Sequence, residues 1–377
     1  MRTRSFIALD LGSTKVTCLV GQPQGGLGGV EILGSGLASY PLMTSWPCEA
    51  ALIARTIEQA LEEVKLTQVP ERVLVALTHP ELSHRRVTAQ IDLAEEPITI
   101  RAKDVARLKT QAVGQTLRID HEPLLLETLS YAGNGFDGVR DPRGLMATRL
   151  SGTFQLVSMP VALRRAVVLA LETVGFEVGQ FVYSLQALAA GLDDTLAAKR
   201  VLLVDLGGCC TDLAIVDHGV LSKTSSVPWG GMYLAERLSR EAGLTMAQAV
   251  TASLGGLSSP KPKVREVIKQ QLPRLAHSLA ELLRDEPRPE SAVLSGRGAL
   301  MDGLAERLEQ MTGLPTVVGR SRHAQRYGEL SRQIAFSGAI GLLELASQQQ
   351  PPAVFSRPSG LLHAVLDRTK FILTEYF

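Results

Sequence analysis

Two short stretches of the chain carry residue types that can hold a phosphate chain and a metal ion. In each, an apolar run ends on Asp-Leu-Gly, small polar residues follow, and a second apolar run begins. Glycine lets backbone N–H groups approach an anion closely, and an aspartate oxygen is a hard ligand suited to hydrated magnesium. The first stretch offers Asp10, Gly12, Ser13, Thr14 and Lys15; the second offers Asp205, Gly207, Gly208, Cys209, Cys210, Thr211 and Asp212. The pattern predicts two strand–turn–strand phosphate-binding turns, which we call the first and second clips.

The repetition of the clip is more informative than either copy alone. A buried hairpin with a glycine turn is common, but two copies in one chain indicate two related halves that face each other across a nucleotide. Asp10 and Asp205 are then expected near the magnesium ion, with water between. A P-loop is not expected, because Gly-Lys-Ser/Thr leading into a helix is missing from both clips.

Two further glycine-rich turns extend the predicted site. Gly230 and Gly231 open a predicted helix over 232–241, and a predicted strand over 292–295 runs into Gly296-Arg297-Gly298. A helix N-terminus of this kind can hold part of a nucleotide by backbone contacts. We therefore add these five residues to the predicted nucleotide-binding set.

Composition narrows the class of protein. With 377 residues, 45% of them hydrophobic, the chain can bury more than one core, and its formal net charge of +1 gives no reason to expect nucleic-acid binding. The four cysteines lack metal-ligand spacing, which favours a reducing, cytosolic compartment. Asp10 interrupts the first apolar run, so no signal peptide is expected. His79, His84 and His121 show no ligand spacing either, and we expect them at the surface or in turns.

The order of the predicted elements suggests an α/β chain with an insertion. Strands and helices alternate up to about residue 80 and again from 161, whereas the stretch between them contains short strands around a helix predicted over 102–116. A helix over 261–283 is expected to be interrupted by Pro273. The predicted parts are 1–80 with 161–197 (first half), 81–160 (inserted α+β subdomain), 198–231 with 290–345 (second half), 232–289 (its small subdomain), 346–358 (linker) and 359–377 (terminal helix).

These motifs resemble the duplicated nucleotide-binding core that actin shares with sugar kinases and heat-shock chaperones. Within that superfamily the chain most resembles the FtsA family of bacterial cell-division proteins, over nearly its whole length. The resemblance includes Leu9–Val16, the second clip, Val139–Gly144 with Arg149-Leu150 in the insertion, and the terminal helix. It implies an actin-like fold that binds ATP and Mg²⁺, with Gln186 on the connecting helix positioning the attacking water.

The same resemblance implies partners. It suggests self-association into filaments, docking of the C-terminal peptide of FtsZ on residues 232–289, and binding of other division proteins through residues 81–160. Lys261, Lys263, Arg265 and Lys269 offer basic groups in the FtsZ-docking region, although a solvated basic face is the commoner explanation of such a run.

Three departures from the family pattern bear on activity. Cys209 and Cys210 stand where the family has glycine and threonine, and a thiol is a weaker hydrogen-bond donor than a hydroxyl. Gln248 and Thr251 stand where the family carries a Glu-x-x-Lys pair near the ribose, and Arg297 replaces a glycine. We therefore expect weakened or altered nucleotide binding, and ATP hydrolysis that is slow or absent.

The C-terminal residues follow a proline-bearing polar linker and repeat at helical spacing. The apolar face is predicted to contain Leu361, Leu362, Val365, Leu366, Ile372, Leu373, Tyr376 and Phe377. A terminal helix docked on its own domain has such a stripe, but the linker and the neighbouring Arg368 and Lys370 favour a helix lying on an anionic inner membrane. The protein is then expected on the cytoplasmic face of the membrane at the division site.

Two other functions fit the same core. One is an actin-like scaffold of type IV pilus assembly, as in PilM, which lacks the linker and terminal helix. The other is a small-molecule kinase, which needs a catalytic carboxylate and a substrate cleft and has no use for an amphipathic terminus. The terminal segment distinguishes these alternatives from the division protein.

Overall fold

The computed structural model describes residues 5–23, 29–43, 45–65, 72–192, 200–321 and 323–348. These residues form two compact units. The core unit comprises residues up to 81 and from 162 to 348, and the inserted domain comprises residues 82–161. The predicted terminal helix, and with it the predicted membrane-binding residues, lies outside the described residues.

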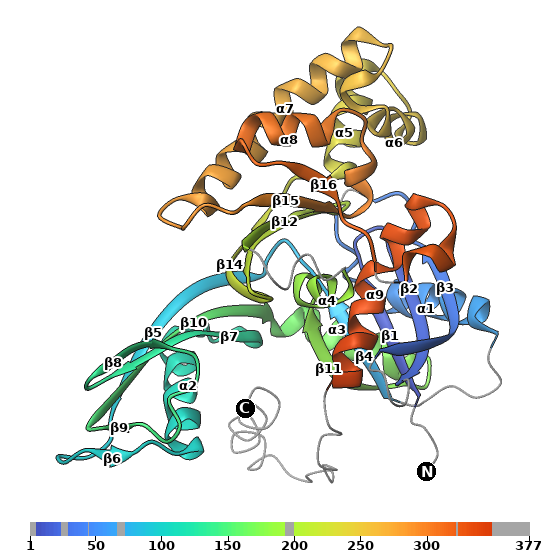
Figure 1. Ribbon diagram of the computed structural model, residues 1–377. Helices are drawn as coiled ribbons and strands as arrows, with labels where there is room; N and C mark the ends of the chain where they lie inside the picture. The colour runs from blue at the N-terminus through green and yellow to red at the C-terminus, as the bar shows by residue number, and fades with distance from the viewer. Residues whose placement is uncertain are drawn as a thin grey trace. The chain divides into compact units, whose positions relative to one another are not determined.

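The first half of the core unit is built around a five-stranded sheet (Figure 1). Its strands, in the order β11-β4-β1-β2-β3, are β11 (Glu177–Tyr183), β4 (Arg72–Leu77), β1 (Phe6–Leu11), β2 (Lys15–Pro23) and β3 (Val30–Ser39). β1 pairs antiparallel with β2 and parallel with β4. The first clip is therefore the turn of the β1-β2 hairpin, and both strands of this hairpin lie inside the five-stranded sheet. Its helices are α1 (Ala50–Val64), α3 (Val161–Thr173) and α4 (Ser184–Gly191).

The second half repeats this topology. Its sheet has the order β14-β13-β12-β15-β16, with strands β12 (Arg200–Leu206), β13 (Thr211–Asp217), β14 (Val220–Val227), β15 (Ser291–Ser295) and β16 (Thr316–Val318). β12, which leads into the second clip, pairs antiparallel with β13 and parallel with β15, just as β1 pairs with β2 and β4 in the first sheet. The predicted α/β core of two related halves is thereby confirmed.

Helices of the second half cover one large apolar cluster. They are α5 (Gly231–Ala242), α6 (Met246–Leu254), η2 (Gly256–Ser258), α7 (Pro262–Leu283), η3 (Arg297–Leu300) and α8 (Leu304–Thr312). Contrary to our expectation, Pro273 does not interrupt α7, which continues through it. A proline inside a helix removes one backbone hydrogen bond, and the buried residues on both sides of it, from Val264 to Leu282, hold α7 against the core.

The last described helix, α9 (Leu330–Gln348), follows η4 (Ala324–Tyr327) and belongs with the first sheet. It packs against α4, β1 and β2, and its apolar residues join the cluster of that half. Residues 330–345, which we assigned to the second half, therefore pack on the first. The helix also continues to Gln348, so the first residues of the predicted linker over 346–358 are helical.

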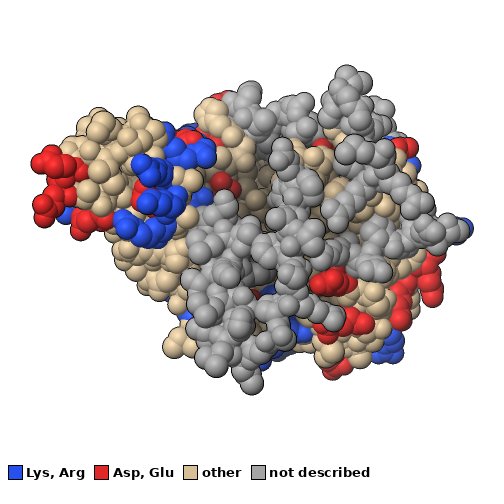
Figure 2. Space-filling view, turned by 90° about the horizontal axis from the view of Figure 1, so that it is seen from below, with Lys and Arg blue, Asp and Glu red and all other residues tan. Residues whose placement is uncertain are grey.

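The inserted domain has an antiparallel sheet in the order β5-β10-β7-β8 and a separate two-stranded ribbon, β6-β9. Its elements are β5 (Ser83–Asp92), β6 (Ile98–Thr99), α2 (Ala102–Thr116), β7 (His121–Gly133), β8 (Phe136–Val139), β9 (Met146–Ala147) and β10 (Arg149–Pro160). Leu108, Ala112 and Val113 of α2 join a core with residues from the sheet, including Phe154 and Leu156. Exposed charges of the two signs form separate groups on this domain (Figure 2).

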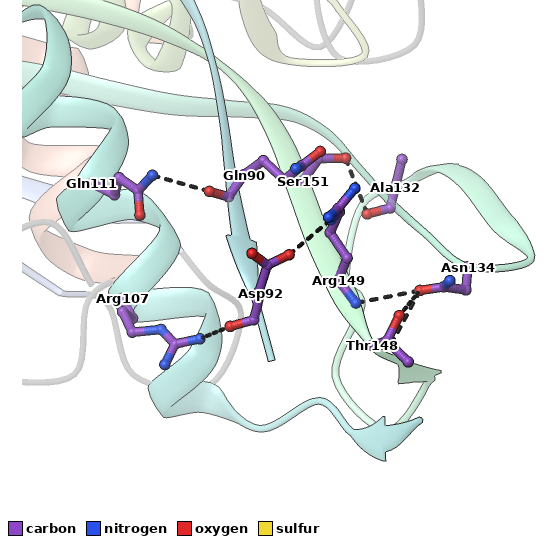
Figure 3. Close-up of polar contacts among 9 residues, drawn as sticks. All are labelled: Gln90, Asp92, Arg107, Gln111, Ala132, Asn134, Thr148, Arg149 and Ser151. Atoms are coloured by element: carbon purple, nitrogen blue, oxygen red, sulfur yellow. Dashed lines mark hydrogen bonds and ion pairs between the residues drawn. The ribbon is translucent and has the colours of Figure 1, made fainter. Parts of the chain in front are cut away.

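Side chains of α2 donate hydrogen bonds to backbone carbonyl groups on the outer edge of β5 (Figure 3). Arg107 donates to the Asp92 carbonyl oxygen at 2.6 Å, and Gln111 donates to that of Gln90 at 3.0 Å. On the opposite side, Arg149 of β10 pairs with the Asp92 carboxylate at 2.8 Å. The free carbonyl groups of an edge strand can pair with a strand of another chain, and these contacts on β5 prevent such pairing.

The expectation that the histidines lie at the surface or in turns is wrong for His79 and His121, whereas His84 is partly exposed on β5. His79 and His121 are buried, with 7% and 3% of their surface exposed. The His79 ring meets Trp46 edge-on, with the ring centroids 5.2 Å apart, and His121 Nδ1 lies 3.2 Å from Ser158 Oγ. Lone histidines lack the periodicity that marks a buried apolar face, so the sequence carries no sign of their burial.

We expect a pH-dependent stability of the inserted domain that depends on His84. Burial lowers the pKa of His84 to about 4, whereas an unfolded histidine titrates near 6.5. The unfolded chain therefore takes up the proton first, and stability falls as the pH drops from about 6.5 toward 4. His84→Gln should remove this component, so that the variant gains about 2 kcal/mol relative to the parent between pH 7 and pH 4.5. Hydrogen exchange of peptides from residues 82–161, corrected for intrinsic rates, measures it, and an unchanged difference at the two pH values contradicts it.

Candidate functional site

Both clips have the same backbone geometry. In the first, the Gly12 N–H donates to the Lys15 carbonyl at 3.1 Å; in the second, the Gly207 N–H donates to the Cys210 carbonyl at 3.0 Å. A Cβ on Gly207 would lie 2.8 Å from that same carbonyl oxygen, so the turn needs glycine there. The two aspartates of the Asp-Leu-Gly motifs, Asp10 and Asp205, end equivalent strands.

The two clips touch each other. The Cys209 N–H donates to Ser13 Oγ at 3.0 Å, and a Cβ on Gly208 would lie 2.3 Å from Thr14 Cγ2. The structure thus brings the predicted residues of both clips together, as the duplicated pattern required. Because the Cys209 amide is bonded to Ser13, it is not among the free donors of the second clip.

The charged groups between the clips are desolvated. Burial raises the pKa of Asp10 to about 6 and, together with the nearby Asp212 and Asp10 carboxylates, raises that of Asp205 to about 7. Burial lowers the pKa of Lys15 to about 8 despite the two carboxylates, and its Nζ donates to the Ala335 carbonyl of α9 at 3.0 Å. One ammonium shared by two desolvated carboxylates leaves a place where added positive charge is favourable.

Asp212 forms the buried floor of the second clip. It is 1% exposed and accepts hydrogen bonds from the hydroxyl of Thr78 and, at 3.8 Å, from the thiol of Cys210. Cys210 is therefore turned under the clip, toward Thr78 and Asp212, and its side chain does not face the phosphates as we expected. Thr78 was missed in the sequence, although its place directly after β4, beside β1, is the signal that could have revealed it.

Glycines bring two more turns against the second clip. Gly296 has φ +74°, and a Cβ there would lie 2.4 Å from the Leu206 carbonyl and 2.6 Å from Asp205 Oδ1. A Cβ on Gly230 would lie 2.4 Å from the Gly208 carbonyl. The N–H groups of Gly231 and Met232, which open α5, donate to the carbonyls of Gly207 and Gly208. The start of α5 thus braces the clip, and these two N–H groups are not directed at a ligand.

A narrow cavity of about 50 Å³ lies beside the clips. It is lined by Thr14, Gly207, Gly208, Gly231, Met232, Val250, Ser253, Leu254, Arg297, Gly298 and Met301. Arg297 is exposed at this cavity, and no hydrogen bond or ion pair joins its guanidinium to another described residue. Gln248, Thr251 and Gln186 do not line the cavity.

These residues fit the phosphate end of a magnesium nucleotide. Thr14, Arg297, Gly208 and Gly298 line the cavity, and the charged groups Lys15, Asp10 and Asp205, buried between the clips, would add a cation and oxygen ligands. Within the described residues, no group of three His, Cys, Asp or Glu side chains forms a metal site by itself. A nucleotide occupies several times the volume of the cavity, so it would need the clips and α6 to separate.

Comparison with known proteins agrees with this description. Residues 80–158 match the model of the SHS2 domain inserted in FtsA. The chain is 22% identical to the cell division protein FtsA of Escherichia coli K12, over 91% of this chain and 90% of that protein. It is 24% identical to FtsA of Pseudomonas aeruginosa, over 95% of this chain and 93% of that protein.

Solved structures show the same fold. The PilM–PilN type IV pilus biogenesis complex matches with a TM-score of 0.70 and 17% identity, over 91% of this chain and 99% of that chain. MreB5 of Spiroplasma citri bound to AMPPNP matches with a TM-score of 0.51 and 14% identity, over 90% of this chain and 95% of that chain.

The chain therefore has the predicted actin-like fold, and the domain inserted in its first half matches the SHS2 domain of FtsA. The resemblance to the FtsA family inferred from the sequence is confirmed: curated FtsA proteins from several bacteria align with about nine tenths of the chain. Within the described residues, no helix is both long and apolar enough to cross a bilayer.

Proposed function

We propose that the protein is a bacterial cell-division adaptor of the FtsA kind, which links FtsZ filaments to the cytoplasmic face of the membrane at the division site. The observation that carries the proposal is the SHS2 domain of FtsA type at residues 80–158, inserted in a chain that resembles curated FtsA proteins almost from end to end. A kinase on the same core has no use for that insertion.

The clips support binding of ATP with Mg²⁺. Asp10 and Asp205 would hold the ion through water, and the glycines and Thr14 would hold the phosphates. Turnover is expected to be slow or absent, because Cys209 adds a side chain to the second clip where the family has a glycine. Gln186, half-exposed on α4, remains our candidate for positioning water.

Residues 232–289 supply the surface proposed for the C-terminal peptide of FtsZ. Along α7, Pro262, Arg265, Glu266, Lys269 and Gln270 line an open groove. Arg265 and Lys269 give this groove a basic character that suits an acidic peptide. The inserted domain, residues 81–160, exposes Ile98 and Met146 of its β6-β9 ribbon and the adjacent Leu145, and these apolar groups support its use by other division proteins and by neighbouring copies in a filament.

The proposed membrane anchor is the amphipathic pattern of residues 359–377, with Leu366 and Ile372 on its apolar face and Thr374 on its polar face. Its cationic excess is small, so binding would be helped when filaments present several copies together.

Sedimentation with anionic liposomes tests the adaptor function. We expect the full chain to pellet with liposomes and to carry FtsZ with it, and a chain truncated after Gln350 to leave both in the supernatant. Leu366→Glu should act like the truncation, because a carboxylate on the apolar face cannot enter the headgroup boundary. Thr374→Glu, which adds the same charge on the polar face, is the matched control and should lose less than half of the binding.

The liposome experiment also distinguishes the adaptor function from a role in pilus assembly. The likeness to the PilM–PilN complex makes a pilus-assembly scaffold the second candidate. If the full and truncated chains pellet equally, or neither pellets, the adaptor function is contradicted and the scaffold function is favoured.

A further inference from the structure

Helix α6 turns its expected ribose-binding positions away from the cavity. The cavity is lined by Val250, Ser253 and Leu254, which share one face at a spacing of three and four residues. At 100° per residue, Gln248 and Thr251 lie about 160° and 100° around the helix from Val250. Both are exposed.

The polar side chains of α6 are also engaged within the helix itself. Gln248 and Thr245 form a reciprocal capping box, in which Gln248 Oε1 accepts from the Thr245 N–H at 3.0 Å. Thr251 Oγ1 donates to the Ala247 carbonyl at 3.2 Å, and Ser253 Oγ donates to that of Val250 at 2.8 Å. No charged side chain of α6 is present to bind a pair of ribose hydroxyls.

The rest of the cavity lining combines apolar side chains with a few polar groups. Met232, Val250, Leu254 and Met301 are the apolar lining residues, against which a base or sugar would pack. Thr14, the glycines of the second clip and the guanidinium of Arg297, which no other described residue pairs, supply the polar part. Arginine matches phosphate oxygens with two parallel N–H donors.

We propose that this site recognises the phosphate chain of its ligand and not the ribose, with Arg297 as the added phosphate-binding residue. The inference rests on the proposed nucleotide binding and specifies its ligand class: polyphosphate compounds, among which nucleotides with and without ribose hydroxyls bind nearly alike. A site that hydrogen-bonds a substrate hydroxyl rejects the analogue that lacks it by factors of about 10⁴ or more. A site that offers the hydroxyl no dedicated partner has no such penalty to impose.

Calorimetric titration of the full chain in Mg²⁺ tests the proposal with ATP, 2′-deoxy-ATP, 2′,3′-dideoxy-ATP, inorganic tripolyphosphate and adenosine. We expect the three nucleotides to have dissociation constants within about threefold of one another, tripolyphosphate to bind within about tenfold of ATP, and adenosine not to bind. Arg297→Ala should weaken every phosphate compound by a similar factor of about 10 to 100, the usual value of a hydrogen bond to a charged group. Arg297→Lys should recover part of the loss.

Arg307→Ala is the matched control, because Arg307 is an exposed arginine on α8 whose side chain bonds to Gln310 and, within the described residues, does not line the cavity. Binding of ATP that exceeds that of the dideoxy compound by more than tenfold would overturn the inference and leave the proposed nucleotide binding standing. An Arg297→Ala variant with unchanged affinities would also overturn it. If neither ATP nor tripolyphosphate binds, the proposed nucleotide binding itself fails, and the inference fails with it.

Discussion

Replacing Gly341 by alanine should lower the free energy of unfolding of the core unit by about 3 kcal/mol, at the upper end of what overpacking usually costs. A Cβ on Gly341 would lie 1.6 Å from the Ala187 carbonyl oxygen, and one on Gly191 would lie 2.3 Å from that of Ser337. The helices α4 and α9 therefore cross with their backbones in direct contact. Both neighbours are backbone atoms of buried helices, so the methyl group can be accommodated only if α9 moves.

The consequence should extend to the clips. Lys15 Nζ bonds to the Ala335 carbonyl of α9, and a Cβ on Gly338 would lie 2.5 Å from Asp10 Oδ2. A displaced α9 thus disturbs the first clip, and Gly341→Ala should also weaken polyphosphate binding.

Urea unfolding followed by tryptophan fluorescence measures the loss, because both tryptophans of the chain, Trp46 and Trp229, belong to the core unit. Gly114→Ala is the control: this glycine lies within α2 of the inserted domain, and a Cβ there would have open space around it to 4 Å, so the tryptophan-monitored unfolding of the core unit should not change. A Gly341→Ala variant as stable as the parent would contradict the packing of α4 and α9.

The clips and their strands could be predicted because continuous apolar runs broken by Asp-Leu-Gly have few other structural solutions. The bounds of α2 also agree with expectation, since it is a periodic run between clear turn residues. The place of α9 could not be predicted in this way. Its residues are small and apolar on most sides, so the sequence indicates a buried helix but not the half of the core that buries it.

The sequence predicted which residues belong to the candidate site but not which way their side chains point. Cys210 and Gln248 were identified as departures, yet whether each faces a ligand depends on the pleat of a hairpin and the rotation of a helix. The pairing of Asp205 with Asp212 in the β12-β13 hairpin determines where the Cys210 side chain points. The capping box that starts α6 determines where the Gln248 side chain points. Thr78 comes next to Asp212 only through the pairing of halves more than a hundred residues apart.

Lys15→Met should change the pH dependence of stability in the absence of Mg²⁺ and nucleotide. Lys15 lowers the pKa of both Asp10 and Asp205, which burial nevertheless raises to about 6 and about 7. An unfolded aspartate titrates near 3.9, so the folded state holds these protons more tightly and stability falls as the pH rises from about 4 to 7. Without the ammonium, both folded-state pKa values rise further, and the fall becomes steeper and extends to higher pH.

The size of the effect follows from the charge that is removed. An opposite charge in contact lowers a carboxyl pKa by about one to three units, each worth about 1.4 kcal/mol, so two carboxyls give about 3 kcal/mol. Between pH 5 and pH 8, measured by urea unfolding in EDTA, Lys15→Met should therefore lose about 3 kcal/mol relative to the parent. At pH 5 the variant should be close to the parent or more stable, because a desolvated ammonium among protonated carboxyls has been replaced by an apolar side chain. Arg297→Met removes an exposed cation from the same site and should leave the profile nearly unchanged. Parallel stability profiles for Lys15→Met and the parent would mean that Lys15 does not compensate the two carboxylates, and the charge arrangement on which magnesium and phosphate binding are proposed would be wrong.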